Sequence, residues 1–520
     1  MEKHLHKNPK GFLSYLYNRT VIVGLAILVQ AAVLVVVLAR FAEFFPFFYA
    51  LNILISVSAV LWLVNNNSNP GYKIIWIIVI MAMPVFGGVF YLMFSGKHLS
   101  RHEKRKLLAI SRKIEQYNTA VCQEPVRQLL HQENPAAARQ SDYIARAANC
   151  PVYQNTFTEY FPIGEAKFAR MLEELEKAEH FIFMEYFIIE EGKMWNTIFE
   201  VLKRKAAQGL DVRLLYDDVG SLMTLPYRYY RTVEEAGIQC CAFNPFVPLL
   251  NARMNNRDHR KICVIDGWVG FTGGINLADE YINVYPKHGH WKDTGILLKG
   301  DAVWSLTVMF LSMWDYVRGV EEDFSQFSPA RYQPALILPQ GYVQPYNDSP
   351  QDDELVGENV YLGMIYSATR YVYICTPYLI VDNEMVTALM TAAKSGVDVR
   401  IITPHIADKW FVHAVTRAYY PVLLEAGVKI YEYTPGFIHA KSFVVDDETA
   451  TVGTINLDYR SLYLHFECGV WLHEAPCIQD MKQDYLDTLE KCEQITMQNY
   501  DQSPLRRLGR SILRLLAPLM

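Results

Sequence analysis

The sequence lacks the features of a disulfide-rich, disordered or nucleic-acid-binding protein. Its nine cysteines in 520 residues include no C-x-x-C pair, which excludes a disulfide framework and a zinc ribbon and favours free thiols in a reducing compartment. The formal net charge is only −6, from 49 basic and 55 acidic residues, so no overall basic character favours a nucleic-acid partner. With 51% hydrophobic and 20% charged residues, the chain is neither disordered nor fibrous.

Long uncharged stretches are concentrated near the N-terminus. Val21–Ala39, Phe47–Val64 and Ile74–Ser95 contain 19, 18 and 22 residues without a charged side chain. Each is about long enough to cross a ~30 Å hydrocarbon core as a helix. We therefore predict a membrane region at residues 1–96 with two to three transmembrane helices, followed by a basic juxtamembrane linker at 97–150.

Basic residues flank these stretches unequally. Four precede the first stretch (Lys3, Lys7, Lys10 and Arg19), and seven follow the third (Lys97, Arg101, Lys104, Arg105, Lys106, Arg112 and Lys113). The side with more basic residues is expected to face the cytoplasm, which places the C-terminal part of the chain inside. Whether the second stretch spans fully, and hence where the N-terminus lies, stays open.

From about residue 151 the pattern is that of an α/β protein, because short β-branched runs alternate with amphipathic helices. The pattern also repeats: His180–Ile189 is echoed by Arg370–Ile380, and Gly209–Leu215 by Gly396–Ile402. A duplication explains both echoes. We predict a first lobe at 151–328, a proline-rich linker at 329–356, a second lobe at 357–500 and an amphipathic basic helix at 501–520.

Each repeat contains one H-x-K-x4-D motif followed by an asparagine. The first copy is His259, Lys261, Asp266 and Asn276, and the second is His439, Lys441, Asp446 and Asn456. Alternation along a strand puts each histidine and its lysine on one face. Each aspartate has the opposite parity, so we interpret the aspartates of these catalytic motifs as turn or scaffold residues. A second strand is expected to return each asparagine toward its histidine.

These residue types favour an anion over a metal ion. Each histidine comes with a lysine that would repel a cation, and no Cys/His/Asp cluster has ligand spacing. Two lysines and two asparagine amides can neutralise and hydrogen-bond a phosphate, while two histidines can act as nucleophile and as general acid and base. The motifs therefore predict phosphodiester chemistry without a metal or another cofactor.

The paired motifs resemble those of the phospholipase D superfamily, and the chain from the third uncharged stretch onward resembles the bacterial cardiolipin synthases. The similar segments include Asn255–Lys261, His290–Thr294 and Gly453–Ser461. The chain departs from the pattern at Gly274 and Thr454, where the superfamily often has serine. It departs again at His465, where related synthases usually carry asparagine.

The resemblance implies a fold of two pseudo-symmetric phospholipase D-like α/β/α sandwich lobes behind N-terminal transmembrane helices. It also implies transfer of a phosphatidyl group between two phosphatidylglycerol molecules, giving cardiolipin and glycerol, in a multi-pass enzyme of the bacterial cell membrane with a cytoplasmic catalytic region. His259 would form a phosphohistidine and His439 would act as acid and base, although the order of the two stays open. Glu467 would orient His259, and Asp293 would orient His439.

The C-terminal segment adds a second membrane feature. At 100° per residue, leucine and isoleucine fall on one arc (Leu505, Leu508, Ile512, Leu515, Leu516 and Leu519) and arginine on the opposite one (Arg506, Arg507, Arg510 and Arg514). This predicts an interfacial helix that contacts anionic lipids, including cardiolipin. The alternative is a helix that packs its leucines onto the second lobe.

Three other functions stay in view. A hydrolytic phospholipase D has the same motifs and uses water as the acceptor. A nuclease of this fold is disfavoured by the net charge and the uncharged stretches, and a non-catalytic scaffold is disfavoured because both histidines and both lysines are present. The sequence leaves acyl-chain preference, the second headgroup and homo-oligomerisation open.

Overall fold

The structure is a computed structural model in which the chain forms two units. It describes residues 19–44, 46–66, 69–83, 87–94, 101–119, 123–246, 255–332, 337–352, 354–500 and 503–519. The first unit is Met1–His98 with Pro245–Met254, and the second is Leu99–Asn244 with Asn255–Met520.

The first unit is helical. Its helices are α2 (Arg19–Phe44), α3 (Pro46–Asn65), α4 (Pro70–Ala82) and α5 (Gly87–Phe94). A small core joins Leu63, Ile75, Ile80 and Tyr91. None of the helices in the described ranges reaches the length and hydropathy of a membrane span, so the transmembrane helices predicted from the uncharged stretches are not confirmed.

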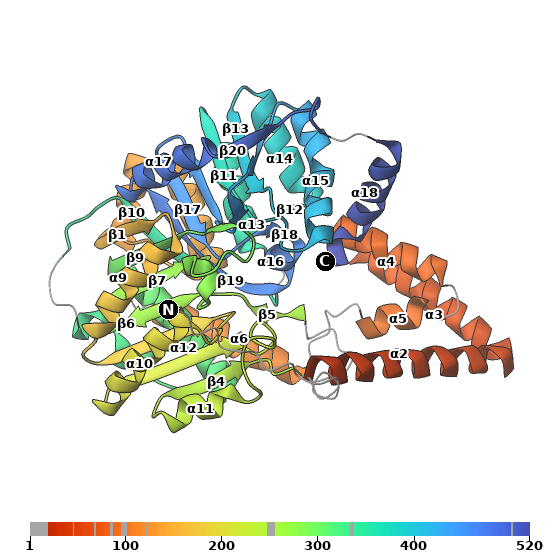
Figure 1. Ribbon diagram of the computed structural model, residues 1–520, viewed down its shortest axis with the longest axis horizontal. Helices are drawn as coiled ribbons and strands as arrows, with labels where there is room; N and C mark the ends of the chain where they lie inside the picture. The colour runs from red at the N-terminus through yellow and green to blue at the C-terminus, as the bar shows by residue number, and fades with distance from the viewer. Residues whose placement is uncertain are drawn as a thin grey trace, which may run out of the picture. The chain divides into compact units, whose positions relative to one another are not determined.

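The described part of the second unit is built on two large sheets (Figure 1). The seven-stranded sheet has the order β1-β9-β7-β6-β2-β3-β4. Its strands are β1 (Thr156–Phe161), β2 (Phe181–Tyr186), β3 (Asp211–Asp217), β4 (Gln239–Phe243), β6 (Ile262–Ile265), β7 (Val269–Gly273) and β9 (Gly295–Gly300). Its helices are α9 (Gly164–Glu176), α10 (Lys193–Ala207), α11 (Tyr229–Glu235) and α12 (Val303–Arg318).

The second sheet has the order β10-β19-β17-β16-β11-β13-β14-β20. Its strands are β10 (Tyr342–Asp348), β11 (Tyr371–Cys375), β13 (Asp398–Pro404), β14 (Lys429–Tyr433), β16 (Ser442–Val445), β17 (Thr449–Gly453), β19 (His465–His473) and β20 (Cys492–Ile495). Its helices are α13 (Val356–Ser367), α14 (Asn383–Lys394), α15 (Trp410–Glu425), α16 (Tyr459–Tyr463) and α17 (Cys477–Leu489). Before β1 come α6 (Arg101–Thr119), α7 (Glu124–Glu133) and α8 (Pro135–Ala147), and α18 (Pro504–Leu516) follows β20.

The two sheets have the same strand order along their shared length. β1, β9, β7, β6, β2, β3 and β4 correspond in turn to β10, β19, β17, β16, β11, β13 and β14. In both sheets a central parallel pair continues into antiparallel neighbours, as β3 beside β2 beside β6 and as β13 beside β11 beside β16. The two-lobed α/β fold predicted from the repeats is therefore confirmed.

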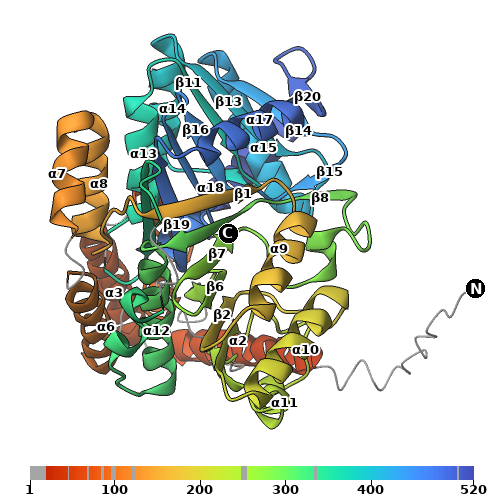
Figure 2. The ribbon, with the colours of Figure 1, turned by 90° about the vertical axis from the view of Figure 1, so that its left-hand side faces the viewer.

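Helices cover both faces of each sheet, so the central strands β2 and β11 are buried along their whole length. In β2, Phe181 and Phe183 belong to one core cluster and Ile182 and Met184 to another, because successive side chains point to opposite faces. Figure 2 shows α9 and α10 on one side of this sheet and α12 on the other.

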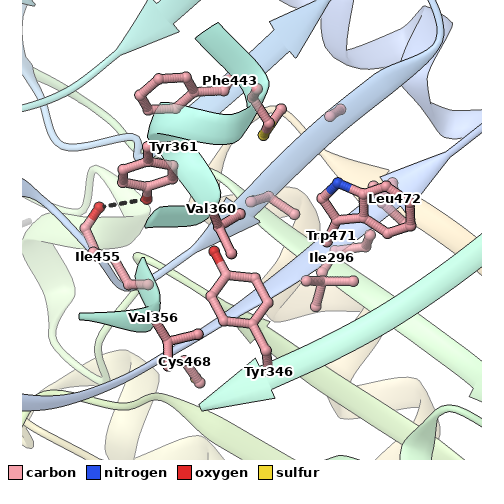
Figure 3. Close-up of a cluster of buried hydrophobic side chains, with 14 of the residues drawn as sticks. Ile296, Tyr346, Val356, Val360, Tyr361, Phe443, Ile455, Cys468, Trp471 and Leu472 are labelled. Carbon is pink, nitrogen blue, oxygen red and sulfur yellow. Dashed lines mark hydrogen bonds between the residues drawn. The ribbon is translucent and has the colours of Figure 1, made fainter. Parts of the chain in front are cut away.

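The core of the second sheet also supports the loop that carries Asn456. The Tyr361 hydroxyl of α13 donates to the Ile455 carbonyl oxygen at 2.8 Å (Figure 3). The ring of Tyr361 stacks on Phe443 with centroids 4.2 Å apart. This hydrogen bond connects the loop after β17 to helix α13.

Two short strand pairs connect the two lobes. β5 (Arg257–Asp258) runs parallel to the start of β19, and β15 (Gly436–Ile438) runs parallel to β8 (His290–Lys292). A further pair joins β12 (Leu379–Ile380) and β18 (Leu457–Asp458) within the second lobe. Each of the first two pairs ends directly before a motif histidine.

Candidate active site

Each motif histidine lies in a short link between two strands. The His259 amide donates to the Phe466 carbonyl at 2.9 Å, and the His439 amide donates to the Lys292 carbonyl at 2.7 Å. The prediction that each histidine lies within the strand that follows is wrong, since β6 begins at Ile262 and β16 at Ser442. The backbone of each histidine is therefore held by a hydrogen bond to the opposite lobe, and the histidine is not part of the motif strand.

His259 is hydrogen-bonded to Glu467 of the opposite lobe. Its Nδ1 lies 2.9 and 3.0 Å from the two carboxylate oxygens. The Thr454 hydroxyl donates to the same carboxylate, and the Cys468 amide donates to Thr454 Oγ1 at 3.0 Å. Since Nδ1 is engaged, Nε2 is the nitrogen of His259 left for a substrate.

His439 is hydrogen-bonded to Asp293 of the first lobe. Its Nδ1 lies 2.6 Å from Asp293 Oδ2, and Oδ1 accepts from the Thr294 amide at 2.7 Å. Gly274 occupies the position that corresponds to Thr454. A Cβ atom on Gly274 would lie 2.1 Å from Asp293 Oδ1, so Asp293 fills the space that a side chain at residue 274 would need.

The two motif lysines are buried beside the histidines. Lys261 Nζ donates to the His259 carbonyl oxygen at 2.5 Å and lies 5.4 Å from the centroid of the Phe187 ring. Lys441 Nζ donates to the His439 carbonyl oxygen and lies 2.7 Å from His439 Nδ1. Both ammonium groups are therefore buried against the backbone of a motif histidine.

Burial lowers the pKa of all four groups, and neighbouring positive charge lowers the pKa of His259, His439 and Lys441 further. Burial lowers the pKa of His259 well below its ordinary value, and the charges of Lys261 and Lys441 lower it further. Burial lowers the pKa of His439 to about 4, with Lys441 adding to the fall and Asp293 opposing it. Burial also lowers the pKa of Lys261 to about 8 and that of Lys441 to about 7. A bound anion would raise all four pKa values, because it stabilises the protonated forms.

The two motif asparagines differ in their contacts. Asn276 Oδ1 accepts from the Ile188 amide at 3.0 Å, and its Nδ2 donates to the Tyr281 hydroxyl at 2.8 Å. Asn456 is buried, and its Oδ1 has no hydrogen-bond partner in the described residues. The phosphate-binding role of both asparagines stays a prediction.

The motif aspartates bind backbone at the far ends of the strands. Asp266 accepts at 2.8 Å from each of the Glu179, His180 and Phe181 amides. Asp446 accepts in the same way from the amides of Thr369, Arg370 and Tyr371 at 2.6, 2.9 and 2.8 Å. Both aspartates have positive φ, +52° and +54°, a conformation typical of tight turns. These contacts fix the turn after each motif strand.

Lys167 and Thr454 lie near the site, although the sequence predicted no role for either. Lys167 of α9 is buried, its Nζ has no hydrogen-bond partner in the described residues, and the charge of Asp293 acts on it. Thr454 was noted only as a departure from a family pattern. No local signal in the sequence separates Lys167 from the other lysines of an amphipathic helix, because its burial depends on contacts with the sheet.

Comparisons with known proteins agree with the geometry. A sequence model described as the phospholipase D-like domain of cardiolipin synthase matches residues 171–287 and 361–488. A second, described as phospholipase D-nuclease N-terminal, matches residues 50–96. The two matches of the first model each contain one motif histidine.

Full-length relatives and a solved structure are also similar. The chain is 43% identical over 469 residues to an uncharacterized protein of Streptococcus mutans, covering 89% of this chain and 100% of that protein. It is 36% identical over 489 residues to a cardiolipin synthase of a Geobacillus species, covering 90% and 94%. A phosphatidylserine synthase of Haemophilus influenzae shares the fold, with a TM-score of 0.55 and 13% identity over 74% of this chain and 99% of that one.

Proposed function

The chain belongs to the cardiolipin synthase family of the phospholipase D superfamily, and on that premise we propose the reaction that its site performs. Two phosphatidylglycerol molecules react to give cardiolipin and free glycerol. The observation that carries this proposal is the pair of buried histidines, each with Nδ1 on a carboxylate and a lysine beside it. The mechanism follows from these contacts.

In the first step His259 is the nucleophile. Glu467 accepts the Nδ1 proton, so the lone pair of a neutral His259 lies on Nε2. Nε2 attacks phosphorus, and a P–N bond forms as the P–O bond to the headgroup glycerol breaks. His439 gives its Nε2 proton to the departing oxygen, which leaves as glycerol.

In the second step His439 acts as a base. Its Nε2 takes a proton from a glycerol hydroxyl of the second phosphatidylglycerol. That oxygen forms a P–O bond while the P–N bond to His259 breaks, which gives cardiolipin and restores both histidines. Asp293 stabilises the protonated imidazole of His439, which is present before the first step and again after the second.

The lysines supply the positive charge in this proposal. Lys261 lies beside His259 and Lys441 beside His439. From there their ammonium groups can neutralise the phosphate oxygens in the transition state. No step needs a metal ion or another cofactor. We therefore expect full activity in the presence of EDTA.

We also propose that the protein is attached to the bacterial cell membrane with its catalytic region on the cytoplasmic side. The sequence of α3 has no charged residue and its side chains Leu54 and Leu61 are 63% and 60% exposed, which suits contact with acyl chains. The basic residues that follow the third uncharged stretch support the orientation.

The contacts of α18 support a second contact with anionic lipid. Leu508 and Ile512 are 60% and 54% exposed, whereas Arg510 and Arg514 lie over the rings of Tyr500 and Tyr419 at 4.5 and 4.4 Å. The helix thus packs against the second lobe through Arg510, Arg514 and Leu513 and exposes Leu508 and Ile512. A helix docked by its leucines would show the opposite arrangement.

A lipid assay tests the reaction. Purified full-length protein is incubated with phosphatidylglycerol in detergent with EDTA, and the lipid products and free glycerol are quantified. Equal amounts of cardiolipin and glycerol are expected. Phosphatidic acid as the main product would show that water is the acceptor and would make the protein a hydrolytic phospholipase D.

A second assay tests the role of α18. The variant Leu508→Gln with Ile512→Gln is compared with the wild type on anionic vesicles and on a soluble short-chain phosphatidylglycerol. We expect lower activity on vesicles only. An equal loss on both substrates would mean that these residues support the fold.

A further inference from the structure

A third histidine lies beside the nucleophile and its carboxylate. His465 is the first residue of β19, and Glu467 follows two positions later on the same face of that strand. The rings of His465 and His259 have centroids 5.4 Å apart. One donor atom from each of His259, His465 and Glu467 lies within 4.8 Å of the other two.

His465 has no internal contact that satisfies its ring. It is only 9% exposed, and neither ring nitrogen has a hydrogen-bond partner in the described part of the chain. Its Nδ1 lies 3.7 Å from Glu467 Oε1, beyond hydrogen-bonding distance. A buried polar group without a partner is costly, and a bound ion that takes its lone pair would remove that cost.

We propose that His259, His465 and Glu467 form an inhibitory site for a divalent metal ion of the zinc type. Two imidazoles and one carboxylate are a common ligand set for Zn²⁺, whose bonds to such ligands are about 2.0 to 2.2 Å long. The separations of the three donors allow one ion to reach all of them after small side-chain shifts. Harder ions such as Mg²⁺ prefer oxygen ligands and are not expected to bind.

Metal binding removes the nucleophile by changing the position of one proton. The ion takes the Nδ1 lone pair of His259, which normally carries the proton that Glu467 accepts. A neutral imidazole has one N–H, so the proton moves to Nε2 and the lone pair needed for attack on phosphorus is lost. Removal of the ion reverses the change, so the inhibition is reversible.

The charges nearby limit the affinity. Lys261 and Lys441 act on His259 and oppose a cation in the same space, so binding in the micromolar range is expected. A bound phosphate anion engages the same lysines and the same histidine. Metal ion and lipid should therefore compete.

The test measures zinc inhibition of the purified full-length enzyme. A soluble phosphatidyl ester of p-nitrophenol is the substrate, so that zinc cannot act by binding anionic vesicles. Micromolar ZnCl₂ should inhibit the wild type, EDTA should restore the rate, and Mg²⁺ should have no effect. Inhibition in His465→Asn, relative to its own metal-free rate, should need at least about tenfold more zinc. Equal zinc sensitivity of both proteins would overturn the proposal.

A control and a second readout separate ligation from damage to the fold. His473 is a buried histidine at the other end of β19, with Nδ1 3.1 Å from Thr449 Oγ1, and His473→Asn should keep the zinc sensitivity of the wild type. Co²⁺ bound to wild-type protein should give the visible absorption of a four-coordinate ion, and His465→Asn should not. No Co²⁺ spectrum in folded wild-type protein would also overturn the site.

Discussion

The two halves of the active site have the same motif spacing but different support for the histidine. Glu467 meets Nδ1 of His259 with both carboxylate oxygens and is held by the Thr454 hydroxyl. Asp293 meets Nδ1 of His439 with one oxygen and lies over Gly274. The duplication therefore preserved the position of each imidazole and changed the groups that determine its charge.

In the proposed mechanism this difference favours a neutral His259 and a protonated His439. The charge and the hydrogen bond of Asp293 oppose the loss of a proton from His439. Lys261, Lys441 and His439 all act against a proton on His259. When an anion enters and raises both pKa values, the environment favours the proton on His439. That arrangement suits His259 as nucleophile and His439 as acid.

The largest expected effect comes from removing one histidine at a time. His259→Ala should lower turnover about 10⁶-fold, the scale seen when a covalent nucleophile is removed. His439→Ala should lose activity mainly because glycerol leaves poorly without a proton. A p-nitrophenyl phosphatidyl ester, whose leaving group needs no proton, should therefore restore the first step in the His439 variant alone. Release of p-nitrophenol in a burst measures this step, and rescue of His259→Ala instead would reverse the assignment.

Removing one lysine should have the next largest effect. Lys261→Met and Lys441→Met should each lower kcat about 10²- to 10³-fold, because loss of one preorganised group that stabilises charge costs about 2.7 to 4 kcal/mol. Steady-state rates with phosphatidylglycerol in detergent measure the loss, and circular dichroism checks the fold. A folded variant with a rate near that of the wild type would make that lysine structural.

Thr454→Val removes the hydroxyl that donates to Glu467. The first lobe has no such hydroxyl, because Gly274 occupies the matching position. A hydrogen bond to a charged group is worth about 1.5 to 3 kcal/mol, so kcat should fall about 10- to 100-fold as Glu467 loses its donor. Thr451→Val is the matched control, because Thr451 is also buried in the second lobe and its hydroxyl makes a 3.4 Å contact with the Tyr346 hydroxyl. Equal rates in the two variants would show that the Thr454 hydroxyl does not contribute to catalysis.

The smallest effect concerns pH. The pKa of Lys441 is lowered to about 7 and that of Lys261 to about 8, so their charge is present below these values and lost as pH rises through them. kcat/KM reports the free enzyme and should fall up to about tenfold per unit above pH 7 to 8, whereas kcat should fall only at higher pH because bound phosphate raises the lysine pKa values. Initial rates across this range measure both parameters. An unchanged kcat/KM up to pH 9 would contradict the lowered pKa values.

The sequence predicted the paired lobes and the residues of the motifs, because a duplication preserves spacing that can be read directly. The prediction that the motif histidines lie within the strands β6 and β16 was wrong. The position of His259 depends on a hydrogen bond to Phe466, a residue far along the chain. The sequence also could not show which face of α18 packs against the second lobe. Its arginines lie over the rings of Tyr419 and Tyr500, which become their neighbours only in the folded protein.

Each motif histidine depends on a strand and a carboxylate of the other lobe. This dependence has a consequence during protein synthesis. Glu467 follows His259 by 208 residues, which a ribosome adds in roughly 10 to 40 s at about 5 to 20 residues per second. Until then the nascent first lobe has His259 but neither the β19 strand beside it nor the carboxylate that binds its Nδ1. A chain that ends before Glu467 therefore lacks half of the proposed site, and we expect activity only when nearly the whole chain has been made.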